Sequence, residues 1–155
     1  MGAHDEPLVD GCRVDELREV SGDVVASVGA LVQQLSSSAA PSRAELESIV
    51  ASPATRLLVA RDDDGTLLGI LTLVLFRIPT GMRAWIEDVV VDDVARGRGV
   101  AQALTRTAVH IARDEGARTV DLTSRPSRVA ANRLYQKMGF VPRETNVYRF
   151  TASDE

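Results

Sequence analysis

The sequence predicts an α/β fold in which helices flank one central mixed sheet whose strands are mostly antiparallel. Apolar residues recur at helical spacing over 24–35, which indicates an amphipathic helix. Two β-type runs, 56–61 and 67–76, are separated by an Asp-Asp-Asp-Gly turn at 62–65, which indicates a hairpin. Residues 82–123 then run as strand, long helix and strand, and this passage requires a parallel crossover. A sheet that contains both a hairpin and a crossover is mixed.

The N-terminal third of the chain contributes a strand and two helices. We expect the first strand near residues 12–18. The helix that follows buries one face, made of Val24, Val25, Val28, Leu31, Val32 and Leu35. After a loop rich in serine and alanine, Ser42 has the features of an N-cap, with Glu45 three residues on as its capping-box partner. This second helix extends toward Ala51.

The C-terminal half alternates strands and helices. In chain order we expect a strand over 82–91, a helix over 97–115, a strand over 119–123, a helix over 127–138 and final strands over 140–142 and 146–150. The two helices are expected to end at Gly116 and Gly139, because glycine commonly follows the last helical residue. Together the elements predict a single domain over residues 1–155, with a flexible tail over 1–11 and a core over 12–150.

The most informative segment is Arg96-Gly97-Arg98-Gly99-Val100-Ala101, which follows an apolar strand and opens the long helix. The first N–H groups of a helix have no partner within it and lie at the positive end of its dipole, so they can hold an anion. Glycine allows close approach of the backbone, and arginine adds charge. The segment therefore predicts a phosphate site. An ordinary helix start with solvated arginines is the alternative.

The glycine spacing decides which phosphate ligand fits. A dinucleotide loop, G-x-G-x-x-G, would need a third glycine where Gln102 stands, and the P-loop string G-x-x-x-x-G-K-[ST] does not occur. The remaining pattern, R-x-x-G-x-A, resembles the acyl-CoA pyrophosphate loop of the GNAT superfamily of N-acetyltransferases. Trp85-Ile86-Glu87-Asp88-Val89-Val90-Val91-Asp92 resembles the central strand of that family, and Asn132-Arg133-Leu134-Tyr135-Gln136-Lys137-Met138-Gly139-Phe140 resembles its L-Y-x-K-x-G-F signature. The resemblance covers residues 56–150 well and the first 55 only in general layout.

The resemblance implies a GNAT-like fold and acetyl-CoA as co-substrate. In that fold the strand before the loop and the strand after the long helix diverge, and the pantetheine arm of the cofactor lies between them. The cofactor-binding residues that this implies are Val89, Val90 and Val91 through their main chain, Arg96, Gly97, Arg98, Gly99, Val100 and Ala101 in the loop, and Asn132 and Tyr135.

The chemistry implied is attack of an amine on a thioester. An alkylammonium ion has a pKa near ~10, so a base or a water chain must remove a proton first. Glu87 is the carboxylate best placed for this step, and Tyr135 is the family's usual donor to the departing thiolate. Glu87 and Asp88 are neighbours on a strand, so we expect them on opposite faces. Trp85 lies on the same face of the strand as Glu87. It either lines the acceptor site or packs as part of the core or its surface cover.

One position departs from the family pattern. Many members carry asparagine seven residues before the tyrosine, and Arg128 stands there in this chain. Asn132 lies on the same helical face and is expected to take over the cofactor contact. Arg128 is then available for a CoA phosphate or an anionic substrate.

The acceptor is a primary amine, and the string over 86–92 favours an amino sugar phosphate, because it resembles the glucosamine-6-phosphate acetyltransferase branch more than the histone-acetylating branch. Members that act on amino acids, polyamines, antibiotics and protein amines share the cofactor motifs, so these acceptors stay open. A non-catalytic acyl-CoA-binding sensor and a structural interaction module are the alternatives to an enzyme. The presence of both Glu87 and Tyr135 favours the enzyme.

Composition indicates a cytoplasmic protein without nucleic-acid or membrane partners. The net charge is −4, and no basic, aromatic-rich segment occurs. No apolar run is long enough to span a bilayer, and no secretory signal begins the chain. Cys12 is the only cysteine, which suits a reducing compartment. We predict no metal, since neither His4 nor His110 has a partner that suggests a site. Because many relatives pair, we also expect a homodimer.

Overall fold

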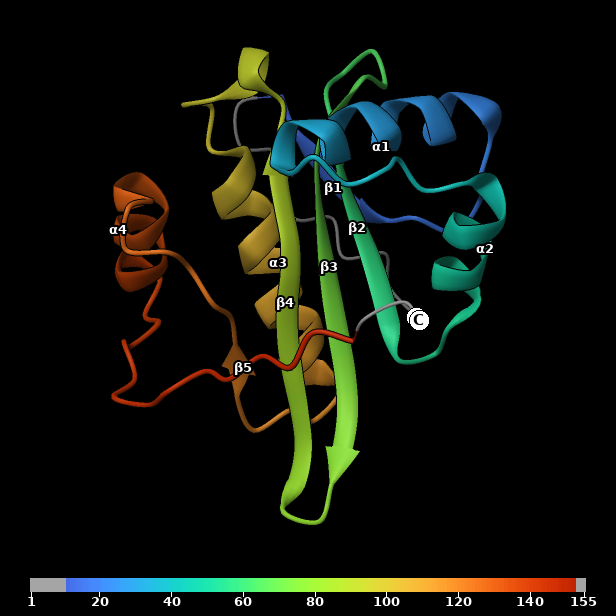
Figure 1. Cartoon of the computed structure of the whole chain (residues 1–155). Coiled ribbons are helices and arrows are strands. Elements are labelled where there is room, and N and C mark those ends of the chain that lie inside the picture. Colours follow the sequence, from blue (N-terminus) through green and yellow to red (C-terminus); the bar gives the residue numbers. More distant parts are fainter. Residues whose placement is uncertain (1–10, 153–155) are drawn as a thin grey trace. The chain divides into compact units, whose positions relative to one another are not determined.

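The computed structural model describes residues 11–152, which divide into two compact units between Thr123 and Ser124. The first unit contains the sheet and three helices, and the second contains one helix and the C-terminal segment (Figure 1). Residues 1–10 of the predicted flexible tail lie outside the described residues.

The first unit is built on one mixed, five-stranded sheet. Its strands are β1 (Arg13–Glu16), β2 (Thr55–Arg61), β3 (Leu67–Ile78), β4 (Gly81–Val91) and β5 (Val120–Asp121). Their order in the sheet follows the sequence. The three pairings from β1 to β4 are antiparallel, and β4 pairs with β5 in parallel. The predicted mixed, mostly antiparallel sheet is therefore confirmed, as are the hairpin and the crossover.

Two helices, α1 (Gly22–Leu35) and α2 (Arg43–Ala51), cover one face of this sheet (Figure 1). The apolar side chains between them form one cluster that includes Val28, Leu31, Leu46, Leu57, Val59, Ile70 and Val90. The predicted capping box of α2 is confirmed: the Ser42 hydroxyl accepts from the Glu45 N–H, and the Glu45 carboxylate accepts from the Ser42 N–H. These caps satisfy N–H groups that would otherwise lack partners at the start of the helix.

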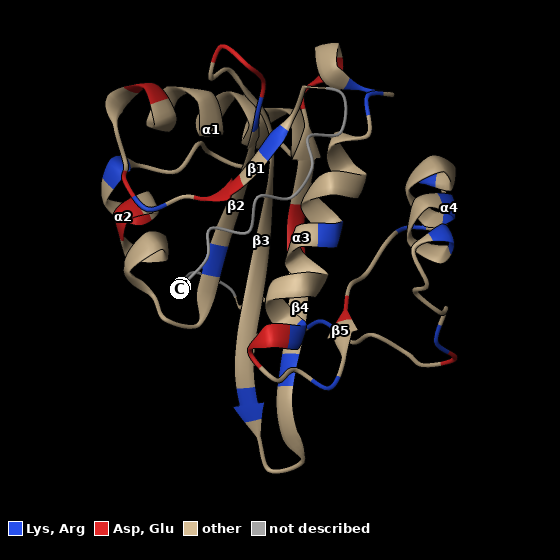
Figure 2. Ribbon diagram, turned by 180° about the vertical axis from the view of Figure 1, so that it is seen from behind, with Lys and Arg blue, Asp and Glu red and all other residues tan. Residues whose placement is uncertain are grey.

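The long helix α3 (Val100–Asp114) covers the opposite face, as Figure 2 shows from behind. Gly69 on β3 allows this close packing. An ideal Cβ at that position would lie 2.8 Å from the carbonyl oxygen of Val90 and 3.1 Å from Cγ1 of Val100. Since Ile70, the next residue, belongs to the cluster under α1, neighbouring residues of β3 serve the two faces in turn.

A bulge in β4 interrupts the predicted alternation at Glu87 and Asp88. Thr72 of β3 pairs with Glu87, whereas Ile70 pairs with Val90, so β4 carries one extra residue between these pairs. Asp88 has a φ of 49° in the left-handed region, and both carboxylates are exposed. The regular strand that was expected through these two residues is therefore interrupted by the bulge. The extra residue returns Val90 to the face of Glu87, where α1 covers it.

We expect Asp88→Val to destabilise the fold by about 1–2 kcal/mol, because a left-handed conformation strains a β-branched residue. Asp88→Gly should be neutral or slightly stabilising, since glycine adopts this φ freely. Urea denaturation followed by circular dichroism measures both variants. Arg83→Val, in the same strand at an ordinary φ, is the control. An equal loss in Asp88→Val and Arg83→Val would contradict the role given to the bulge.

The second unit begins with α4 (Val129–Lys137), which ends as predicted, with Gly139 at a φ of 97°. The ring centroids of Tyr135 and Phe140 are 5.8 Å apart in an edge-to-face arrangement. The predicted strands over 140–142 and 146–150 were wrong, because residues 138–152 form neither helix nor strand. Apolar residues there favour a strand, but a strand exists only where its backbone finds a partner.

Candidate functional site

The chain between β4 and α3 forms the predicted strand, glycine turn and helix start. A short 3₁₀ helix, η1 (Asp93–Ala95), follows β4, and Gly99 precedes the first residue of α3. Gly97 and Gly99 have φ values of 77° and 80°, so both are in the left-handed region. This conformation explains why α3 starts at Val100 and not at Gly97 as predicted. It also shows why glycine is suited to both positions.

The N-terminus of α3 differs from those of α1 and α2. Ser21 and Ser42 cap those two helices with their side chains, and each helix has an acidic residue in its first turn. The N-cap of α3 is Gly99, which offers no side chain, and the first turn contains no acidic residue. The first N–H groups of α3 and the dipole are thus left without the negative side-chain partners that the other two helices have. This arrangement suits an anion.

Two arginines, Arg96 and Arg98, precede the start of α3. Arg96 forms an ion pair with Asp93, with 2.7 Å between Nη2 and Oδ1, and the Arg96 side chain is 73% exposed. Burial raises the pKa of the Cys12 thiol, and the positive charge of Arg98 opposes that rise. Arg98 therefore acts electrostatically on Cys12, the residue that precedes β1. An exposed pair such as Arg96–Asp93 contributes little stability and can exchange for a phosphate.

The part of β4 nearest this loop pairs with β3 but not with β5. Pairing with β5 covers Ala84 and Trp85 alone, whereas β3 pairs with β4 as far as Val91. In the described part of the chain, the segment of β4 that contains Val89–Val91 therefore has a partner strand on one side. The predicted strand over 119–123 is reduced to two residues for the same reason. A ligand with amide groups can pair with such an edge.

Glu87 and Trp85 are brought together on the α1 face of β4. The indole Nε1 of Trp85 donates a hydrogen bond of 2.8 Å to Oε1 of Glu87. This bond holds one oxygen of the carboxylate and fixes its direction, while Oε2 remains for a second donor. The structure thus places Trp85 and Glu87, two of the three residues predicted for the acceptor site, in one hydrogen-bonded pair.

Asp121 is a neighbour of this pair that the sequence did not predict. It lies opposite Trp85 in the parallel pairing of β4 and β5, and paired residues point to the same face of a sheet. The Thr119 hydroxyl donates to its Oδ2 at 3.3 Å. The position of Asp121 within a predicted strand was visible in the sequence, but the register of a parallel pair was not.

The remaining predicted residues, Arg128, Asn132 and Tyr135, lie in the second unit. Asn132 donates from Nδ2 to the carbonyl oxygens of Arg125 and Arg128, both at 2.9 Å, so its amide holds the turn before α4. Tyr135 is 7% exposed. Burial raises the pKa of its phenol, and the charge of Arg128 partly opposes this. The phenol therefore keeps its proton at neutral pH.

Two classes of site find no support within residues 11–152. None of the helices there has the length and hydrophobicity that crossing a bilayer requires. Those residues also contain no group of three or more His, Cys, Asp or Glu side chains that could hold a metal ion.

Comparison with known proteins shows which family this chain matches. The model of the acetyltransferase (GNAT) family matches residues 36–140, which include α2, the sheet from β2 onward, α3 and α4. A curated relative, mycothiol acetyltransferase from Beutenbergia cavernae, is 34% identical over 90 residues. That match covers 58% of this chain and 29% of the relative, so the chain spans less than a third of the relative's length.

Solved structures show the same fold. An acetyltransferase from Trypanosoma brucei superimposes with a TM-score of 0.74 at 24% identity, covering 90% of this chain and 99% of its own. Glucosamine-6-phosphate N-acetyltransferase from Arabidopsis thaliana superimposes with a TM-score of 0.77 at 18% identity, covering 91% of this chain and 99% of its own. At these identities the likeness is one of fold.

Proposed function

Because the chain belongs to the acetyltransferase (GNAT) family, we propose that it transfers the acetyl group of acetyl-CoA directly to a primary amine. The observation that carries this proposal is the start of α3: two glycines in the left-handed region, no side-chain cap, no acidic first turn and two flanking arginines. The family uses acetyl-CoA as co-substrate. Residues 12–150 would act as one acetyltransferase domain.

The residues present fit a CoA pyrophosphate and pantetheine arm. In our proposal the N–H groups from Gly97 to Ala101 bind the pyrophosphate, and Arg96 exchanges Asp93 for a phosphate oxygen. The main chain of Val89–Val91, on the edge of β4 beyond its pairing with β5, binds the amides of the arm. Asn132 supports the site by holding the turn before α4.

Glu87 is the proposed base. It accepts a proton from the acceptor ammonium ion, directly or through water, and the neutral nitrogen then attacks the thioester carbonyl carbon. The C–S bond breaks as the tetrahedral intermediate collapses, and the sulfur leaves as a thiolate. The nitrogen loses its second proton to solvent water, and solvent later returns a proton to Tyr135. Trp85 supports this role because its hydrogen bond fixes the carboxylate. Tyr135 is the proposed acid that gives its proton to the thiolate.

Tyr135→Phe should lower kcat on the order of 100-fold and leave the Kd for acetyl-CoA unchanged, because only proton donation is lost. Burial raises the pKa of this phenol above its ordinary value of 10.0, so the wild-type enzyme should show no loss of turnover from its ionisation below that pH. Tyr148→Phe, at an 88% exposed tyrosine of the same unit, is the matched control. Full turnover by the Tyr135→Phe protein would remove the acid role.

The proposed cofactor is tested by calorimetric titration with acetyl-CoA, with dephospho-CoA and NAD as comparison ligands. Saturable binding of acetyl-CoA and none of NAD is the expected result. Equal binding of NAD and acetyl-CoA, or binding of neither, would contradict the assignment of the loop. A homodimer and a cytoplasmic location stay predictions of the sequence, and sedimentation equilibrium tests the first.

The acceptor is a primary amine in this proposal, and an amino sugar phosphate is the acceptor that the sequence of β4 favours. The structural neighbour named for glucosamine 6-phosphate shares the fold of this chain, and at 18% identity the likeness does not extend to the acceptor.

A further inference from the structure

An apolar strip lies next to Glu87 on the α1 face of the sheet. We define the strip as Val74, Phe76 and Trp85. Val74 and Trp85 are directly paired across β3 and β4, so their side chains stand side by side on one face. Phe76 follows Val74 on the same face, and its side chain is 38% exposed, while the other two are half-buried.

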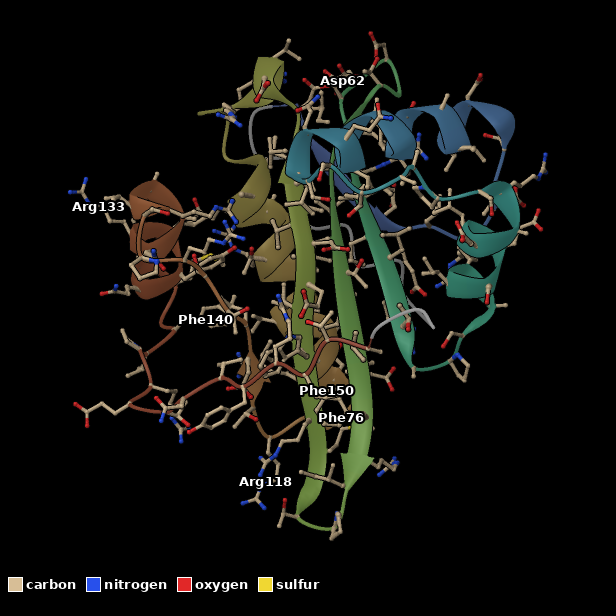
Figure 3. The ribbon with its side chains drawn as sticks, viewed as in Figure 1. Asp62, Phe76, Arg118, Arg133, Phe140 and Phe150 are labelled. Carbon is tan, nitrogen blue, oxygen red and sulfur yellow. The ribbon has the colours of Figure 1, made fainter. Side chains whose placement is uncertain are left out.

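The strip is exposed because the β3–β4 hairpin is longer than the layer that covers it. Ile70 and Val90 pair under α1 and belong to the buried cluster. The last pairing of β2 with β3 joins Thr55 to Val74, so Phe76 lies past the end of β2. Figure 1 shows the hairpin continuing beyond α1 and α2, and Figure 3 labels Phe76 on this part of β3.

Charge is distributed unevenly along this strip. Glu87 lies at one end, with its Oε1 held by the Trp85 indole. Asp121 lies beside Trp85 on β5. Arg83 pairs with Phe76 at the other end, where its guanidinium donates to the Thr80 hydroxyl at 3.4 Å. A ligand that reaches Glu87 across the strip therefore passes over apolar carbon, with Asp121 beside Trp85, and meets the Glu87 carboxylate at the end.

We propose that the acceptor is a primary amine on an apolar, preferably aromatic, body, with its ammonium group at Glu87 and its body on the strip. This inference rests on the proposed acetyl transfer and names its substrate class. The Cα atoms of Glu87 and Trp85 are about 7 Å apart, because the two residues are two positions apart on one strand. A ring joined to an ammonium group by a two-carbon linker has a similar length. The cation is complementary to Glu87 and Asp121. The sugar ring of an amino sugar phosphate would instead place hydroxyl groups against the apolar side chains of the strip, where they lose water without gaining hydrogen-bond partners.

The experiment compares acceptors with the full chain and acetyl-CoA. The probes are 2-phenylethylamine, ethylamine and glucosamine 6-phosphate, and kcat and KM are measured for each. We expect kcat/KM for 2-phenylethylamine to exceed that for either of the other two by at least tenfold. Most of the difference from ethylamine should lie in KM, because the phenyl ring adds buried apolar area and no new chemistry.

Two variants locate the effect on the hairpin. Phe76→Ser should lower the ratio of kcat/KM for 2-phenylethylamine over ethylamine about tenfold. The phenyl ring of the acceptor, placed on Val74 and Trp85, would lose its apolar neighbour at position 76. Ile78→Ser is the matched control, because Ile78 is as exposed, at 40%, but lies one step farther from Glu87 on the same face. That variant should change the ratio by less than about twofold. Equal effects of the two variants would contradict the proposed strip.

The outcomes separate this inference from the proposed function. Efficient acetylation of glucosamine 6-phosphate with little acetylation of 2-phenylethylamine would overturn the inference and leave acetyl transfer to amines intact. Acetylation of 2-phenylethylamine no better than ethylamine would overturn it in the same way. Absence of acetyl-CoA binding in the calorimetric titration would overturn the proposed function and the inference with it.

Discussion

Replacement of Gly99 by aspartate should weaken acetyl-CoA binding about 100-fold or more, which is the largest effect on cofactor binding expected of a single substitution in this chain. The new carboxylate would stand at the N-terminus of α3, where the pyrophosphate is proposed to bind. Like charges brought together in a binding site cost several kcal/mol, and about 1.4 kcal/mol corresponds to tenfold in Kd. Calorimetric titration with acetyl-CoA measures the loss.

The matched control for that variant is Gly116→Asp. Gly116 follows α3 at its other end with a φ of 85°, and an added Cβ there meets no atom within 4 Å. Both substitutions therefore carry a similar backbone strain, about 1 kcal/mol or somewhat more. Gly116→Asp should lose stability to that extent and keep its affinity for acetyl-CoA. Unchanged affinity in Gly99→Asp would contradict the phosphate site, and an equal loss in both variants would show that strain alone is responsible.

Glu87→Gln should lower kcat by 10²- to 10³-fold, about the contribution of a general base, while acetyl-CoA binds as before. The amide oxygen of glutamine can still accept the Trp85 hydrogen bond, so the local geometry is retained and the loss reports the proton transfer. Steady-state kinetics with a primary amine of ordinary basicity measures it. Full turnover by this variant would remove Glu87 from the mechanism.

A second acceptor makes this test specific to proton removal. An amine of low basicity, such as 2,2,2-trifluoroethylamine, is already neutral at pH 7 and needs no base before attack. The deficit of Glu87→Gln should therefore shrink at least tenfold with that acceptor. An equal deficit with both amines would indicate that Glu87 positions the substrate and does not accept the proton.

Local signals in the sequence predicted much of the fold. Ser42 and Glu45 cap α2 as expected, because a capping box depends only on residues three apart in the chain. The Asp-Asp-Asp-Gly turn between β2 and β3 is equally local: Asp62 accepts from the N–H groups of Asp64 and Thr66. The loop before α3 was recognised for the same reason, since its glycines and arginines are contiguous.

Features that depend on distant partners were not predictable in this way. The bulge at Asp88 arises from the register between β3 and β4, and a regular strand was the default expectation. Asp121 lies beside Trp85 only because β5 pairs in parallel with β4 at that point. The strands expected over 140–142 and 146–150 were inferred from side-chain pattern, which does not supply a backbone partner.

The central claim, that the chain moves an acetyl group from acetyl-CoA to an amine, is tested most directly by following two products of one reaction. The full chain is incubated with acetyl-CoA and a primary amine, free CoA thiol is measured with a thiol reagent, and the acetylated amine is measured by mass spectrometry. Both products should form in equal amounts, and both should require the amine. If acetyl-CoA binds saturably but neither product forms with any one of the three amines tested above, the proposed enzymatic activity would be contradicted. That result would favour an acyl-CoA-binding sensor.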